Sequence, residues 1–171
     1  MKKLYTLSAL LFLSFMLFSC GDDKPSDLPV DVNSTAKKSY TIIAAAGSTT
    51  SQDLIFTLED FTALKDYLKY VESGAIQNSS YIEVKGVPED AELTNVKLSL
   101  KSDSKKNIVL PNINSNIKFD ELPHLTFMQL IINELVNSNR NTSIVKLEYK
   151  ANSDITSPLT ITIYLNSRFS F

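Results

Sequence analysis

Apolar and polar residues alternate with a period of two in the last third of the chain. In the segment 159–167, the odd-numbered positions from Leu159 to Leu165 are apolar and the positions between them are mostly polar. The segment 143–151 alternates in the same way, and turn-forming residues occupy 152–158. This alternation is typical of strands with one buried face. The two segments therefore predict a β-hairpin.

Five further segments have the character of strands. They are 39–46, 53–58, 81–87, 93–102 and 107–119. Pro111 interrupts the last of these segments. Because proline has no amide hydrogen to donate to a neighbouring strand, we expect 107–119 to lie at a sheet edge or to be kinked.

The segment 58–73 changes to helical spacing. Thr57, followed three residues later by Asp60, fits a capping box at its start, and Gly74 supplies a stop. Four apolar residues recur at the spacing of one helical face: Phe61, Leu64, Leu68 and Val71. These signals predict an α-helix over 58–73.

A second helix is predicted over 125–136. The residues at helical spacing are Met128, Ile131, Ile132 and Leu135. Phe127 and Leu130 widen the apolar face, so this helix is expected in the core rather than on the surface.

The resulting order of elements is β-β-α-β-β-(β)-α-β-β within a single β-rich domain at 39–171. A mainly β fold, an antiparallel β-sandwich with two helices, fits this order. The alternative is an α+β fold, in which one antiparallel sheet carries both helices on one face.

The chain begins with a different pattern. Two lysines precede an uncharged apolar run from Leu4 to Phe18, and Cys20 follows. This run is shorter than the roughly 20 residues that a membrane-spanning helix needs. Its composition predicts a cleaved signal peptide over residues 1–19.

The residues Leu17-Phe18-Ser19-Cys20 resemble the lipobox of bacterial lipoproteins, although Phe18 departs from the commonest residues at its position. The resemblance implies cleavage before Cys20 and attachment of acyl chains to that cysteine. Two or three acyl chains hold a protein stably on a membrane. Because Cys20 is the only cysteine, the chain cannot form an internal disulfide.

Acids follow the cysteine. The segment 20–38 begins with Gly21, Asp22 and Asp23 and contains two prolines, so we expect a flexible acidic tether. Surface lipoproteins of the Bacteroidetes resemble this chain in carrying acids just after the lipidated cysteine. The resemblance implies an outer-membrane protein displayed on the cell surface, with the periplasmic face of that membrane as the alternative.

The charge balance argues against nucleic acid as a partner. Removal of residues 1–19 removes two of the 17 basic residues and none of the 19 acidic ones, and so lowers the formal net charge from −2 to −4. A nucleic-acid binder shows a basic stripe instead. The expected partner is the membrane, through the lipid on Cys20.

No catalytic constellation stands out. His124 is the only histidine and is expected in a loop or helix cap. The adjacent carboxylates fall at turns or helix starts, where acids favour capping and solvation. These pairs are Glu59-Asp60, Glu89-Asp90 and Asp120-Glu121. The segment 111–121 lacks the spacing of a calcium loop, and no metal or other cofactor is predicted.

Tyrosines are the remaining candidates for a binding surface. They are Tyr67, Tyr70, Tyr81, Tyr149 and Tyr164. They could form a stacking face, or they could lie half-buried at the boundary of the core.

The sequence thus predicts a lipid-anchored cell-envelope protein with a non-catalytic binding or assembly role. The second hypothesis is a capture module for a glycan or a small apolar ligand, and the third is an enzyme. A tyrosine-lined face or an apolar pocket would favour capture, whereas an open strand edge or a flat apolar patch would favour a protein partner.

Overall fold

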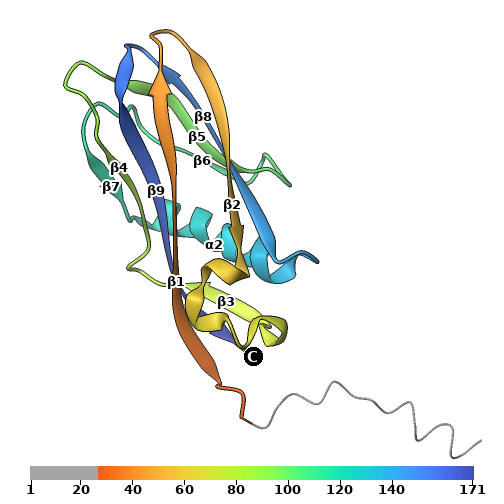
Figure 1. Cartoon of the computed structure of the whole chain (residues 1–171). Helices are drawn as coiled ribbons and strands as arrows, with labels where there is room; N and C mark the ends of the chain where they lie inside the picture. The colour runs from red at the N-terminus through yellow and green to blue at the C-terminus, as the bar shows by residue number, and fades with distance from the viewer. Residues whose placement is uncertain (1–26) are drawn as a thin grey trace, which may run out of the picture.

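The computed structural model describes residues 27–171. The expected signal peptide, Cys20 and the first acids of the tether lie outside the described residues. Within them the fold is mainly β, with two antiparallel sheets that share one core in a sandwich-like arrangement (Figure 1). One α-helix is present in the described part of the chain, not two.

The first sheet has the order β1-β9-β4-β7, and β3 also pairs with β9. Its strands are β1 (Asp31–Ala44), β3 (Ser73–Ile76), β4 (Tyr81–Lys85), β7 (Ile117–Phe119) and β9 (Ile155–Ser170). The long strand β9 pairs with β1 along one edge and with β4 and β3 along the other. Ser80 lies between β3 and β4, and its hydroxyl exchanges hydrogen bonds with the main chain of Asn166.

The second sheet has the order β2-β8-β5-β6. Its strands are β2 (Thr49–Thr57), β5 (Leu93–Leu100), β6 (Asn107–Val109) and β8 (Thr142–Ala151). The predicted hairpin of the last two strands is wrong, because β8 pairs within this sheet and β9 within the first. The predicted segment 107–119 is divided at Pro111 into two short edge strands. Since β6 belongs to the second sheet and β7 to the first, the segment that contains Pro111 crosses from one sheet to the other.

Strand β1 begins at Asp31, before the expected domain boundary at residue 39. Residues 31–38, predicted to be part of the tether, belong to the folded domain because they pair with β9. Little apolar alternation marks this half of β1. The two buried residues in it are Ser34 and Ala36, which are too small or too polar to give a strand signal.

The predicted helix over 58–73 is wrong. The segment forms three short 3₁₀ turns, η1 (Leu58–Asp60), η2 (Thr62–Leu64) and η3 (Leu68–Tyr70), and then enters β3. The capping contact is nevertheless present, because the Thr57 amide donates to the Asp60 carboxylate at 2.7 Å.

The second predicted helix is confirmed as α2 (Leu122–Asn137). It lies across one end of the sandwich-like fold and contacts β3 and β8 (Figure 1). Its buried face consists of His124, Phe127, Met128, Ile131, Ile132 and Leu135. No helix in the described range is long and apolar enough to cross a membrane.

The core also contains one polar link between the sheets. Tyr40 on β1 is 2% exposed. Its hydroxyl donates to the main-chain carbonyl of Val145 on β8 at 2.7 Å. Burial raises the pKa of the Tyr40 hydroxyl, and the charge of Asp53 adds to this effect. The hydroxyl therefore stays protonated and keeps donating to the opposite sheet.

Candidate functional site

The strongest candidate site surrounds the C-terminal half of α2. Two hollows of about 370 and 360 Å³ share Glu134 and Ser138 as lining residues. We call the two hollows together the α2 site. Its lining residues are Lys101, Ser102, Lys106, Leu130, Asn133, Glu134, Asn137, Ser138, Asn139, Arg140, Thr142 and Ile144.

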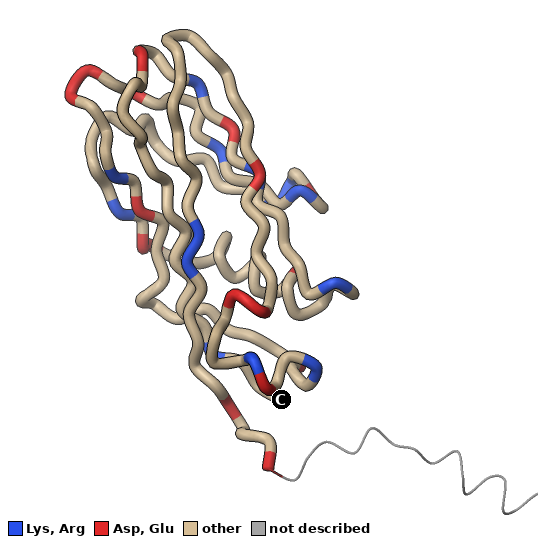
Figure 2. Tube along the Cα trace, in the orientation of Figure 1, with Lys and Arg blue, Asp and Glu red and all other residues tan. Residues whose placement is uncertain are grey.

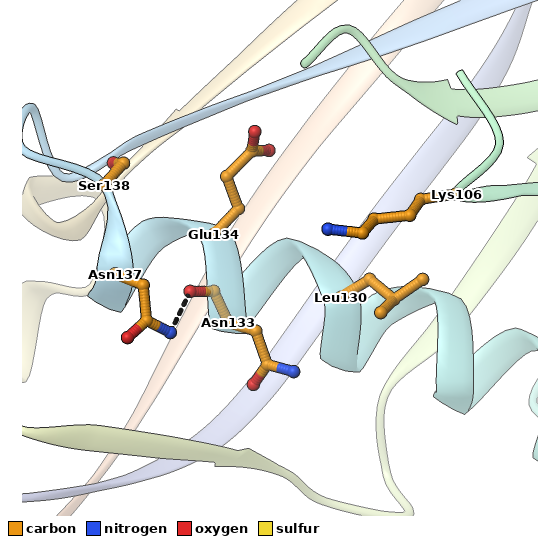
Figure 3. A pocket seen from close by; sticks show the side chains of 6 residues that line it. All are labelled: Lys106, Leu130, Asn133, Glu134, Asn137 and Ser138. Carbon is orange, nitrogen blue, oxygen red and sulfur yellow. Dashed lines mark hydrogen bonds between the residues drawn. The ribbon is translucent and has the colours of Figure 1, made fainter. Parts of the chain in front are cut away.

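Four elements supply these residues, and strand β8 contributes Thr142 and Ile144. The helix presents Asn133, Glu134 and Asn137, which lie within one turn of each other (Figure 3). The loop between β5 and β6 supplies Lys106, whose side chain reaches over Leu130 toward the helix (Figure 3). The loop after α2 supplies Arg140.

The loop after α2 is held by its own hydrogen bonds. The Ser138 hydroxyl accepts from the Thr142 amide at 2.9 Å, and the Asn141 amide donates to the Ser138 carbonyl at 3.0 Å. Asn141 has a φ of 49°, a left-handed conformation that asparagine tolerates better than most residues. The turn therefore follows from this sequence and directs the chain into β8.

Glu134 is fixed by a buried partner. The hydroxyl of Ser143, which is fully buried, donates to Glu134 Oε2 at 2.5 Å. This bond holds the half-buried carboxylate in the lining that both hollows share, and Oε1 has no hydrogen-bond partner among the described residues. The pocket lining includes a single carboxylate, whereas glycoside hydrolysis normally needs two across the sugar.

The charge around Glu134 is positive. Three cations line the α2 site, and both loops that carry them show basic positions in Figure 2. Lys101 is paired with Asp53 at 2.5 Å. Lys106 and Arg140 have no carboxylate within ion-pair distance among residues 27–171. The two unpaired cations and Glu134 together leave one net positive charge.

The carboxylate pairs predicted from the sequence are not brought together. Asp60 binds Lys38 at 2.8 Å, and Asp120 binds Lys118 at 3.0 Å. Glu59 lines a smaller hollow beside Asn141, and Glu89 is exposed in the loop after β4. Within the described residues, no group of three or more histidine, cysteine, aspartate or glutamate side chains could hold a metal ion.

His124, expected in a loop or helix cap, lies in the helix just after the cap and is buried. It occupies the first turn of α2, is 9% exposed, and lies beside the ring of Phe119 with centroids 5.0 Å apart. Its Nδ1 atom is buried with no protein partner in the described chain. Pro123 lies in the first turn of the helix, where proline is well tolerated, but the sequence does not indicate that this turn packs against β7.

The five tyrosines do not form one surface. Tyr149 is 1% exposed in the core. Tyr67 packs edge-on against Phe171 at 5.5 Å, and Tyr70 lies under the Lys69 ammonium at 4.7 Å.

Tyr81 and Tyr164 do lie together on the outer side of the first sheet. Their rings stack with centroids 4.9 Å apart and planes 21° apart, and the Lys118 ammonium lies 4.6 Å from the Tyr81 ring centroid. Tyr164 and Lys118 thus both contact the Tyr81 ring. These contacts join β4 to its two neighbouring strands, β9 and β7, and so stabilise the first sheet.

Sequence reasoning did not identify the α2 site. The available signal was the polar stripe of α2, with Asn133 and Asn137 four residues apart, followed by an amide-rich loop. Lys106 could not be placed beside these residues, because the chain between them crosses from one sheet to the other.

Comparisons with known proteins add little to this geometry. No protein-family model and no curated protein matches the chain. One similar solved structure is titled "Desmodium yellow mottle tymovirus". It is 14% identical, has a TM-score of 0.40, and aligns with 86% of this chain and 95% of its own. A similarity this low carries no inference about function.

Proposed function

We propose that this chain is a lipid-anchored lipoprotein of the cell envelope whose β-rich domain is a non-catalytic binding module. The observation that carries the anchoring is the lipobox-like sequence that ends at Cys20. The α2 site supports a binding role, because it offers hydrogen-bonding groups and cations around one fixed carboxylate rather than a pair of carboxylates.

The arrangement of the chain ends is compatible with anchoring. Strand β1 starts, and β9 ends, at the same end of the domain (Figure 1). The covalent chain from Cys20 to Asp31 spans at most about 40 Å. A lipid on Cys20 would keep this end near the membrane and direct the turns between β1 and β2 and between β8 and β9 away from it.

Capture of a glycan is the second candidate function. The α2 site favours it over capture of a small apolar ligand, because Leu130 and Ile144 are the only large apolar side chains among its lining residues. Carbohydrate hydroxyls need donors and acceptors close together, and the asparagines with Glu134 supply both.

Substitution of the lipidated residue tests the anchoring. Cys20→Ser should move the protein from the membrane fraction to the soluble fraction and abolish labelling with a clickable fatty acid. Ser14→Ala, in the same apolar run, should change neither result. Labelling that persists in Cys20→Ser would contradict the proposal. Protease added to intact cells then distinguishes surface display, in which the domain is digested, from the periplasmic face, in which it is protected.

A further inference from the structure

We propose that the α2 site binds a saccharide that carries a carboxylate. This inference rests on the proposed binding function and names the class of its ligand. The argument comes from the charge of the α2 site, from its unsatisfied hydrogen-bonding groups, and from its size.

The charge matches a single negative group. Lys101 is neutralised by Asp53. Lys106, Arg140 and Glu134 then leave one net positive charge, which one carboxylate on the ligand would balance. The planar guanidinium of Arg140 can donate two parallel hydrogen bonds to a carboxylate. A phosphate ester carries about two negative charges at neutral pH and would lie close to Glu134, so it fits less well.

The hydrogen-bonding groups match hydroxyls. Within the described chain, Asn133 Oδ1 accepts from Gln129 at 2.8 Å, and Asn137 Nδ2 donates to the Asn133 carbonyl at 2.7 Å. These bonds leave Asn133 Nδ2 as a donor, and Asn137 Oδ1 and Glu134 Oε1 as acceptors. A sugar hydroxyl both donates and accepts, so neighbouring hydroxyls on one ring can use groups of both kinds.

The shape also fits a saccharide. Each hollow is open to solvent and, at about 360–370 Å³, has the volume of a small ligand pocket. Leu130 in one hollow and Ile144 in the other can contact the C–H face of a sugar ring. Because the hollows share Glu134 and Ser138, two linked sugar residues could occupy them together.

The lining is held in place before a ligand arrives. Glu134 is fixed by Ser143, and the loop that carries Arg140 is fixed by Ser138. A preformed site loses less conformational entropy on binding. The side chains of Lys106 and Arg140 are exposed on their loops and can adjust to the ligand.

The test uses the full chain, purified in detergent, and two-dimensional NMR of its side-chain amides. The probes are short oligomers of galacturonate, glucuronate and mannuronate, sialyllactose, and the methyl esters of each, which keep the sugar and remove its charge. Galactose 6-phosphate is the phosphate comparison. We expect at least one acidic saccharide to shift the Asn133 and Asn137 amides, and its methyl ester to bind at least about fivefold more weakly.

Variants then assign the contact. Lys106→Gln and Arg140→Gln should each weaken binding of the acidic saccharide by roughly two- to fivefold, the effect of an exposed ion pair. Lys85→Gln, outside the α2 site, should not change it. Added salt should reduce the difference between the acid and its ester.

Three outcomes would overturn the inference. Equal binding of acids and esters would show that the site takes neutral glycans. Tighter binding of galactose 6-phosphate than of every carboxylate would assign it to phosphate. Absence of shifts at Asn133 and Asn137 with all probes at millimolar concentration would exclude acidic saccharides. None of these results affects the Cys20→Ser test, so the anchoring proposal stands or fails separately.

Discussion

Helix α2 and the segment from Leu58 to Ile76 have similar sequence patterns and different structures. Both carry apolar residues spaced three and four apart, and both have residues suited to start a helix. Only α2 forms an α-helix, whereas the other segment forms 3₁₀ turns and a short strand. The comparison shows which further features decide between the two outcomes.

Main-chain hydrogen bonds show that the first part of the 58–76 segment forms 3₁₀ turns instead of an α-helix. Main-chain amides bond to carbonyls three residues earlier in four successive steps: Phe61 to Leu58, Leu64 to Phe61, Tyr67 to Leu64, and Tyr70 to Tyr67. Residues three apart eclipse each other in a 3₁₀ helix. The spacing that predicted one face of an α-helix therefore also suits consecutive tight turns, and it still buries Phe61 and Leu64 completely.

The width of the apolar face separates the two regions. Helix α2 buries adjacent pairs, Phe127 with Met128 and Ile131 with Ile132, so its contact surface covers more than one row of side chains. A single row of apolar residues, as in 58–73, gains less from an α-helix. The segment also has to reach β9, with which β3 pairs through Ser73 to Ile76.

The largest expected effect is truncation of the wide face of α2. Ile131 is fully buried. Ile131→Ala should lower the free energy of unfolding by about 2–5 kcal/mol, through lost burial and the cavity left behind. Urea denaturation followed by circular dichroism measures it.

Leu122 in the first turn of the same helix is the control, because it is 76% exposed. Leu122→Ala should change the free energy of unfolding by less than about 0.5 kcal/mol. An unchanged denaturation midpoint for Ile131→Ala would mean that α2 is a detachable element. The width of its buried face could then not explain why α2 is helical and 58–76 is not.

The sequence predicted the elements whose signals are local. The last two strands, the split at Pro111 and α2 follow from alternation, from proline chemistry and from a wide apolar face. The pairing of the last two strands does not, because β8 and β9 lie in different sheets. The missed parts depend on distant partners. The first half of β1 is a strand because β9 lies beside it, and β3 is one because β9 and Gln129 satisfy its main chain.

The α2 site likewise combines a feature with a local sequence signal and features that depend on distant parts of the chain. The stripe of amides on α2 is visible in the sequence, but its meaning depends on Lys106 and Arg140, which two separate loops bring to Glu134. Tyr81 and Tyr164 were correctly predicted to lie in strands. The sequence did not show that the strands pair in the register that stacks these two rings against each other. Which side chains meet is decided by strand pairing, which no local pattern reports.

A smaller effect is expected where the two regions touch. A Cβ atom on Gly74 would lie 2.6 Å from Ile132 Cγ2 and 3.0 Å from the Phe169 ring. Gly74→Ala should therefore cost about 1–3 kcal/mol of stability through overpacking. The neighbouring substitution Ala75→Ser, at an exposed position, should stay within about 0.5 kcal/mol. Equal denaturation midpoints for Gly74→Ala and the unsubstituted chain would show that β3 does not pack against α2 as closely as the structure has it.

The smallest effect concerns a side chain that joins the two regions. The Gln129 carboxamide accepts from the Ile76 amide at 2.7 Å and donates to the Gly74 carbonyl at 2.9 Å. One side chain of α2 thus supplies the hydrogen bonds that a further strand would give to the edge of β3. Without it, these two main-chain groups would have to bond to water, which can reach them because Gly74 and Ile76 are only half-buried.

Gln129→Met keeps the length and much of the packing of the side chain and removes both hydrogen bonds to β3, together with the exposed bond to Asn133 Oδ1. It should cost about 1 kcal/mol, the net value of such bonds where water can replace them. The sharper readout is hydrogen exchange, in which the Ile76 amide should lose protection while amides in the middle of α2 keep theirs. Gln77→Met is the matched control, because the Gln77 side chain donates to the Asn33 side chain at 2.6 Å and not to the main chain of β3. This substitution should leave the protection of the Ile76 amide unchanged. If Gln129→Met also left the Ile76 amide protected, pairing with β9 alone would hold β3 in place, and the hydrogen bonds from α2 would not stabilise this strand.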